Sequence, residues 1–371
     1  ATLFSYAYGQ RAIPKLAEVL SDKSRTEEQR VQTLTSLLNL LSSQEEKCAA
    51  LSATPSIPQR LNKLIHSETE PVRRLSADCL ASLAMVMQGR IAIHEHDIVP
   101  SITAHLKDQS SSVRTASARA LRAISSSRDG CAMLAEDAVV TPLVESLDVE
   151  EVETLEASLR ALSNLMRLDI GIEVALDTDV VARLQRVMQR GADDSLADVV
   201  LGCLQCVFNL ANTHDGKRSV IHVDLVASIA HLLAHPPQVD SAQGDDGELE
   251  RLAVGCIMAI TIAKEGKLQA ASSAVNPVCD LLQASTPAFT QRSVIAAIKN
   301  IAEHPPAREA FTKRLAPHGV DMLQIADGKV WPDSNRYVHQ NVEPAGDGFE
   351  ADKALRKRWG YPEPHPTELE G

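Results

Sequence analysis

Apolar positions recur at helical spacing along most of the chain. Residues 158–165 read Ser-Leu-Arg-Ala-Leu-Ser-Asn-Leu, so small residues at 158 and 161 and leucines at 162 and 165 share one face of a helix. A face with small residues lets a second helix approach closely. Gly171 follows, and because glycine takes a positive φ at no steric cost, we expect it to end or redirect the helix.

This pattern repeats. Positions equivalent to Asn164, here called the asparagine column, return at intervals of 41 to 50 residues: Asn39, Ser82, Ala123, Asn164, Asn209, Ala259 and Asn300. Seven positions later stands a glycine in five units: Gly89, Gly130, Gly171, Gly216 and Gly266. The first and last units have Glu46 and Ala307 there, as expected for the atypical ends of a stacked array. Two columns in register over seven units predict a repeat protein.

Each repeat is predicted to contain three helices. Pro100, Pro142 and Pro277 follow their glycines by 11 or 12 residues, and proline suits the first turn of a helix. A short helix from the glycine, a second from the proline and a long third helix, at a period near 40–47, are typical of armadillo repeats. We therefore predict an all-α, right-handed armadillo-repeat α-solenoid of about seven three-helix repeats with an irregular C-terminal tail. Its parts are an N-terminal arm (1–9), the solenoid (10–317), and a C-terminal cap and docking tail (318–371).

Local signals place several long helices. The first is predicted over Glu27–Leu41 and the second over Pro71–Met87. Residues 110–112 are serines, which suits the N-cap of the third. Glutamates at 150, 151 and 153 suit the positive N-terminus of the fourth, so this charge run is interpreted as structural.

Three stretches are more specific than the armadillo pattern. They read AYGQRAIPKLAEVL at 7–20, HEHDIV at 94–99, and HVDLV at 222–226, which leads into HLL at 231–233. They resemble segments at matching places in the radial spoke armadillo proteins. A sister armadillo subunit of the radial spoke is an alternative match. The resemblance does not extend to the tail after about 318.

This resemblance implies a non-enzymatic structural subunit of the radial spoke in the axoneme of cilia and flagella. Such a subunit binds other radial spoke proteins in a large hetero-complex and supports the regulation of dynein motility. The alternative is a soluble armadillo adaptor or transport receptor that carries a peptide cargo in its groove.

Composition narrows the class of partner. The net charge of −12 argues against nucleic acid or an anionic membrane as the main partner. No run of about 18 apolar residues predicts a membrane span, and the first residues lack a secretory signal pattern. Seven cysteines, an odd number without a scaffold spacing, indicate reduced thiols in an intracellular protein.

Candidate chemistry is sparse. Cys203 and Cys206 have redox or zinc spacing, but they fall in the small-residue column of a long helix, which favours packing. His231 and His235 lie four apart without the zincin glutamate, and His94 and His96 have the wrong spacing. The acidic stretch 240–248 lacks the second oxygen ligand of a calcium loop. We therefore predict no enzyme, no cofactor, no metal site and no small-molecule substrate.

The predicted concave surface supplies candidate partner-binding residues. Four positions before the asparagine column stand Thr35, Asp78, Arg119, Arg160, Gln205, Gly255 and Ala296. Importin-type armadillo proteins carry tryptophans in this column, and their absence argues against binding of nuclear signals. Arg119, Arg122 and Arg160 form a basic centre that could bind an acidic or carbonyl-rich segment, or could simply be solvated. Asn164, Asn209 and Asn300 could bond a partner's backbone or a neighbouring helix.

Aromatic residues concentrate at the chain ends. Three of the eleven precede residue 9, and five lie in the tail: Trp331, Tyr337, Phe349, Trp359 and Tyr361. Tryptophan and tyrosine often anchor interfaces. We therefore expect a cap near 318–331 followed by an arm that docks on a partner.

Overall fold

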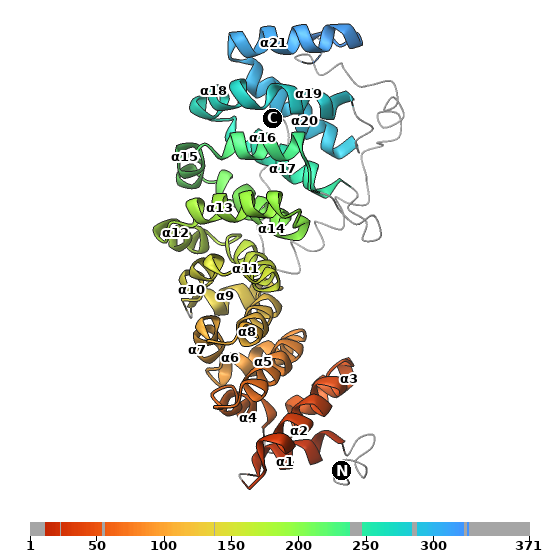
Figure 1. The fold of residues 1–371 in the computed structure, drawn as a ribbon, viewed down its shortest axis with the longest axis vertical. Coiled ribbons are helices and arrows are strands. Elements are labelled where there is room, and N and C mark those ends of the chain that lie inside the picture. The colour runs from red at the N-terminus through yellow and green to blue at the C-terminus, as the bar shows by residue number, and fades with distance from the viewer. Residues whose placement is uncertain are drawn as a thin grey trace, which may run out of the picture.

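The structure is a computed structural model that describes residues 12–22, 24–53, 56–136, 138–237, 247–283, 288–322 and 325. Within these ranges all regular secondary structure is helical. The helices stack into an elongated, curved array (Figure 1). The predicted fold class, an all-α solenoid, is confirmed.

The helices of the described residues fall into three sets. The short first helices are α3 (Gln44–Ser52), α6 (Met87–Glu95), α9 (Arg128–Glu136), α12 (Asp169–Asp177), α15 (His214–His222), α18 (Lys264–Ser273) and α21 (Pro305–Leu315). The second helices are α1 (Ala12–Ser21), α4 (Ile57–Leu64), α7 (Val99–Ala104), α10 (Val140–Glu145), α13 (Val180–Asp193), α16 (Leu225–Ala234) and α19 (Val275–Gln283). The long third helices are α2 (Glu27–Leu40), α5 (Glu70–Ala84), α8 (Ser111–Ile124), α11 (Val152–Leu165), α14 (Ala197–Ala211), α17 (Glu248–Ile260) and α20 (Ala288–Ala302). Short 3₁₀ turns, η2 (His105–Lys107), η3 (Ser146–Asp148) and η4 (Ala316–His318), extend α7, α10 and α21.

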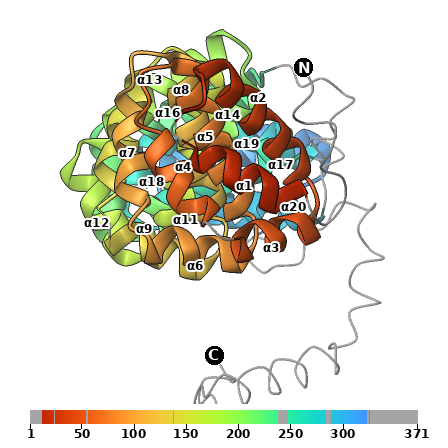
Figure 2. The ribbon, with the colours of Figure 1, turned by 90° about the horizontal axis from the view of Figure 1, so that it is seen from below.

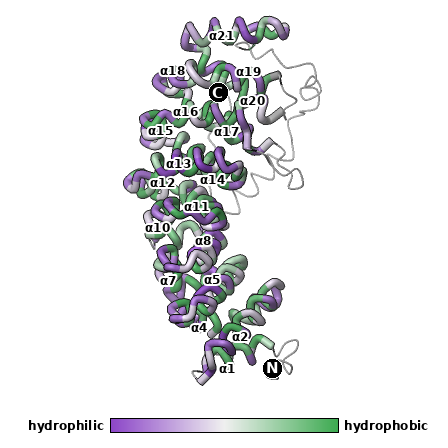
Figure 3. The backbone as a smooth tube through the Cα atoms, in the orientation of Figure 1, coloured by the Kyte–Doolittle hydropathy of each residue, from purple (hydrophilic) through white to green (hydrophobic). Residues whose placement is uncertain are grey.

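The long helices form the spine of the array. Each contacts the next, from α2 and α5 through to α17 and α20. Seen along the long axis, successive units project onto one another (Figure 2). Apolar and polar stretches alternate along the helices (Figure 3), and the buried side chains make one cluster that runs from Ile13 to Ile325. Burial of this shared core, rather than any single unit, therefore holds the array together.

The recurring glycines allow a close approach between helices. Gly171 lies inside α12, and among the described glycines only Gly247 and Gly319 have a positive φ. Our expectation that Gly171 redirects the chain through a positive φ is therefore wrong. A Cβ atom at this position would overlap the carbonyl oxygen of Leu165, the last residue of α11. The glycine is needed because the first helix of a unit crosses directly over the end of the preceding long helix.

A left-handed residue recurs in the turn between the first and second helices. Asp97, Ala138, Asp179 and Asp224 have φ values of 53°, 52°, 57° and 54°. Each stands fifteen positions after the asparagine column. Aspartate tolerates this conformation better than most residues. The stretches 94–99 and 222–226 both contain this turn, so part of their sequence has a structural explanation.

The predicted boundaries were correct at most helix starts. Ser110 is the N-cap residue of α8 and Glu151 that of α11, although neither side chain caps its helix. The second long helix ends at Ala84, so the predicted extension to Met87 is wrong. Met87 instead begins α6, because the chain must turn for Gly89 to reach the carbonyl of Leu83.

Ion pairs bridge neighbouring units at the starts of the long helices. Arg73 on α5 binds Asp108 with two parallel bonds, Nε to Oδ2 at 2.9 Å and Nη2 to Oδ1 at 3.0 Å. One unit later, Arg114 on α8 pairs with Glu151 and donates to the carbonyl of Asp108. Equivalent arginines therefore fix the spacing of consecutive repeats.

The C-terminal end of the array is covered within the described residues. Val320 and Met322 pack against the core, and Ile325 is buried. The predicted cap over 318–331 extends beyond the described residues and stays a prediction. The N-terminal arm 1–9 and the five candidate anchors of the tail lie outside the described residues: Trp331, Tyr337, Phe349, Trp359 and Tyr361.

Candidate functional site: the concave face

The long helices lie on the inner side of the curve (Figure 1). Their exposed or half-exposed positions recur eight and four before, one before, and three after the asparagine column. The first three offsets follow the 3.6-residue period, and the fourth falls just after the end of the helix, so together they form one stripe, here called the concave stripe; Ser163 and Gly255 are its buried members. Stacked stripes produce a continuous surface, as extended solenoids typically have.

Four arginines stand in the middle of this surface. Arg119 and Arg122 project from α8 and Arg160 from α11, whereas Arg167 follows the end of α11 at Leu165; all four are exposed. Among the described residues none of the four has a carboxylate within 4.0 Å, the ion-pair distance. The three predicted arginines are thus exposed on two adjacent helices without an ion pair in the described ranges, and Arg167, just after α11, adds a fourth. Their role in partner binding stays a prediction.

Carboxylates flank the arginines at longer range. Burial raises the pKa of Asp78 on α5, while the charges of Arg74 and Arg119 oppose that rise. Burial, with the neighbouring Asp198 and Glu153, raises the pKa of Glu156 on α11, and Arg122 and Arg119 oppose it. The charges of Arg119 and Arg122 therefore act on carboxylates of the neighbouring helices α5 and α11, although no ion pair with these arginines is found among the described residues.

The asparagines serve the stacking of the units. Asn209 donates from Nδ2 to the carbonyl of Ser163 at 2.8 Å, one helix back along the array. Asn300 donates in the same way to the carbonyl of Met258 at 3.1 Å, and Asn164 donates to Oγ of Ser125 at 3.2 Å. Of the two readings left open by the sequence, bonding to a neighbouring helix is present in the structure, and binding of a partner's backbone by the remaining amide groups stays a prediction.

The concave stripe changes character after α11. On α14 and α17 the positions one before the asparagine column are Phe208 and Met258, both half-buried, and Ile262, three after the column, follows the end of α17. Gly255 stands where α8 and α11 carry Arg119 and Arg160. Our sequence reasoning missed this apolar section because it compared only one column; the replacement of charged by apolar residues in two further columns was the signal.

The cysteines and histidines considered as metal or redox groups lie in the packed helices of the array or at their ends. Cys203 and Cys206 are buried in α14, and Cys206 donates from Sγ to the carbonyl of Leu159. Burial raises the pKa of both thiols. The imidazole rings of His231 and His235 stack with centroids 4.7 Å apart. Within the described ranges no group of three or more His, Cys, Asp or Glu side chains could hold a metal ion. Residues 240–246 of the acidic stretch lie outside these ranges, and Glu248 begins α17.

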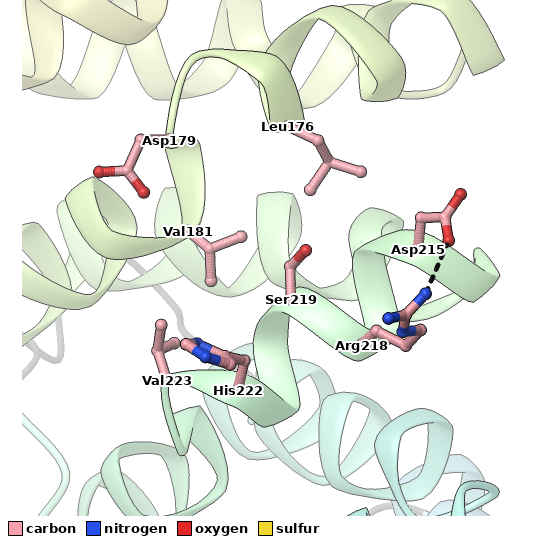
Figure 4. A pocket seen from close by; sticks show the side chains of 8 residues that line it. All are labelled: Leu176, Asp179, Val181, Asp215, Arg218, Ser219, His222 and Val223. Carbon is pink, nitrogen blue, oxygen red and sulfur yellow. Dashed lines mark ion pairs between the residues drawn. The ribbon is translucent and has the colours of Figure 1, made fainter.

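A separate cleft opens between the first helices of two units, away from the concave stripe. Its volume is about 520 Å³, and it is lined by Leu176, Asp179, Val181, Asp215, Arg218, Ser219, His222 and Val223 (Figure 4). Arg218 reaches Asp215 at 4.0 Å, so its charge is partly compensated. The cleft mixes acidic, basic and apolar groups without converging on one ligand chemistry.

Comparison with known proteins supports the architecture. A HEAT-repeat family model matches residues 98–127, which span α7 and α8. The crystal structure of an engineered protein is similar with a TM-score of 0.69 and 22% identity, covering 86% of this chain and 76% of that chain. This chain has the fold of an armadillo- or HEAT-type solenoid.

Designed armadillo proteins are also similar. One, YIII(Dq)4CqI, has a TM-score of 0.57 and 18% identity over 66% of this chain and 99% of that chain. Another, in complex with the peptide (KR)4, has a TM-score of 0.58 and 18% identity over 67% of this chain and 99% of that chain.

No curated protein matches the sequence. No helix of the described ranges is long and apolar enough to span a bilayer. At these identities the similarity establishes the fold and not the function.

Proposed function

We propose that this protein is a non-enzymatic scaffold whose concave face binds a protein partner through an acidic or carbonyl-rich segment. The observation that carries this proposal is the set of four exposed arginines on α8, on α11 and just after α11, none of which has an ion pair among the described residues. A guanidinium presents a planar fork of donors that suits carboxylates and backbone carbonyls. Elsewhere in this chain arginines are used in that way, as Arg73 is with Asp108.

The proposed setting is the axonemal radial spoke of cilia and flagella. There the protein would act as a structural subunit, bound to other radial spoke proteins and supporting the regulation of dynein. The stretches 7–20, 94–99, 222–226 and 231–233 support this assignment through their resemblance to radial spoke armadillo proteins. Weak contacts spread over a long concave surface, with aromatic anchors such as Trp331 and Trp359 in the tail, suit a permanent assembly.

Charge reversal tests the concave face. The double variant Arg119→Glu/Arg160→Glu should lose partner capture by at least about tenfold while its thermal midpoint stays near that of the parent, because both side chains are exposed. The matched control is Arg218→Glu/Lys264→Glu, which makes the same change in net charge at exposed positions on α15 and α18. Equal capture by both double variants would refute binding through the concave arginines.

Fractionation tests the setting. Cilia are extracted with detergent and then with mild salt, and the protein is followed by immunoblotting. A structural spoke subunit should pellet with the axonemes and resist the salt, whereas release into the first soluble fraction would instead indicate an adaptor or transport receptor. Deletion of 332–371 should leave helicity intact and release the protein from the axoneme; full retention would rule out the docking arm.

A further inference from the structure

The concave face has a second section next to the arginines, and it carries no charge at the three positions nearest its centre. For α14 these positions are Gln205, Phe208 and, just after the helix, Asn212; for α17 they are Gly255, Met258 and, just after the helix, Ile262. The charged residue of the α17 stripe, Arg251, pairs with Glu248 at the start of the helix. The section is therefore neutral and, on α17, apolar.

The side chains of this section are only partly covered by the protein. Ile262 is 64% exposed, and Phe208 and Met258 are half-buried. A Cβ atom added to Gly255 would lie 3.3 Å from Cε2 of Phe208, so the ring lies against a position that has no side chain. These residues, Phe208, Gly255, Met258 and Ile262, are here called the apolar floor.

The arginines and the apolar floor are consecutive along the stack. α11, which carries Arg160 and is followed by Arg167, contacts α14, and α14 contacts α17. A single extended segment that lies along the concave face would thus meet both sections. The arginines define the chemistry of one part of that segment by charge complementarity, and the floor defines the other part by its apolar surface.

We infer that the concave face recognises a bipartite segment of a partner protein, in which an acidic stretch lies on the arginines and a bulky apolar side chain lies on the apolar floor. This inference rests on the proposed function. Packed helices lie about 8–10 Å apart, so the centres of the two sections are separated by roughly 16–20 Å. An extended chain rises about 3.3 Å per residue, which places the apolar residue about five or six positions from the middle of the acidic stretch.

Synthetic peptides test this arrangement by fluorescence anisotropy. The first peptide carries four glutamates in a Gly/Ser background, the second adds a phenylalanine six positions from their centre, and the third places the phenylalanine among the glutamates. The second peptide should bind at least about tenfold more tightly than the other two. Added salt should weaken all three, because each depends on the arginines.

Variants of the protein locate the effect. Ile262→Ser should reduce the advantage of the second peptide at least about fivefold and leave the binding of the first unchanged. Met85→Ser is the matched control, since Met85 is 61% exposed at the same register position on another unit. It should affect neither peptide.

The outcomes separate the two proposals. If the acidic peptide binds and the placed phenylalanine adds nothing, or if Ile262→Ser behaves like Met85→Ser, the bipartite inference is wrong and the proposed function stands. If none of the peptides binds the parent protein in low salt, recognition of acidic segments by the concave face is wrong as well.

Discussion

Replacement of Asp108 by asparagine is expected to lower the free energy of unfolding by about 2–3 kcal/mol. Asp108 follows η2 and accepts two bonds from Arg73 of the preceding unit. It also accepts the backbone N–H of Ser110, the N-cap residue of α8, at 2.9 Å. Asparagine keeps the shape of the side chain but removes the charge, so the guanidinium of Arg73 loses its counter-ion.

The magnitude follows from the burial of the pair. The side chains of Arg73 and Asp108 are 17% and 9% exposed. Removing one partner of a fully buried ion pair costs about 3–5 kcal/mol, whereas an exposed pair contributes about 0–1 kcal/mol. A pair that is mostly but not fully buried, with bidentate geometry, belongs between these limits, and asparagine retains part of the hydrogen bonding.

The assay is urea unfolding followed by circular dichroism, with Glu145→Gln as the control. Glu145 pairs with Lys107 at 2.8 Å and also joins consecutive units, but the two side chains are 42% and 68% exposed. The control should change stability by no more than about 0.5 kcal/mol. If both variants lose the same stability, burial does not set the strength of the bridges between units.

The pH dependence offers a second check. Burial alone would raise the pKa of Asp108, but the hydrogen bonds from Arg73 and the Ser110 N–H hold that pKa below its ordinary value. The stabilisation is therefore present above the ordinary value of about 3.9 and is lost as the pH falls through the lowered pKa. The difference between parent and Asp108→Asn should stay constant from about pH 5 to 8 and shrink in stronger acid; a difference that grows in acid would contradict this account.

Three further predictions concern single positions. Gly171→Ala should lower the thermal midpoint, because the steric cost of about 1–3 kcal/mol against the Leu165 carbonyl exceeds the helix-propensity gain of about 1 kcal/mol; a higher midpoint would refute the close approach. Ala138→Asn should raise the urea midpoint by the equivalent of about 0.5–1 kcal/mol, since asparagine tolerates the φ of 52° better than alanine, and no gain would show that the turn is unstrained. Glu156→Gln should stabilise the protein at pH 7–8, because burial and two neighbouring carboxylates raise the pKa of Glu156 and its ionised form therefore costs stability. That gain should disappear as the pH falls below about 4.3, and its persistence in acid would contradict this assignment.

The repeat was readable from the sequence because its signals are local. The asparagine and glycine columns, with prolines at helix starts, depend on the helical period and on backbone chemistry within a few residues. The same period placed Arg119 and Arg160 on one face before any packing was known. The boundary near Met87 was missed because it depends on the passage of α6 over the end of α5, which is a contact between helices.

Whether a polar side chain of a long helix is paired depends on the residues that the neighbouring unit places beside it. Arg73 and Arg119 both belong to long helices, yet the first is paired with a carboxylate 35 residues away and the second has none within ion-pair distance among the described residues. Asn209 likewise has its donor bonded 46 residues back. The helical period of the sequence does not reveal which residues of neighbouring units are bonded to each other. That pairing is set by how far each unit is displaced and rotated relative to the one before it.

The sequence by itself thus determined the number and kind of units, the face that each long helix buries and the residue types on the exposed face. Only the tertiary structure decided which arginines remain available, which amides hold the stack together, and where Phe208, Met258 and Ile262 adjoin the arginines. The physical reason is range: helical pattern acts over one or two turns, whereas pairing and exposure depend on packing between units about 40 residues apart.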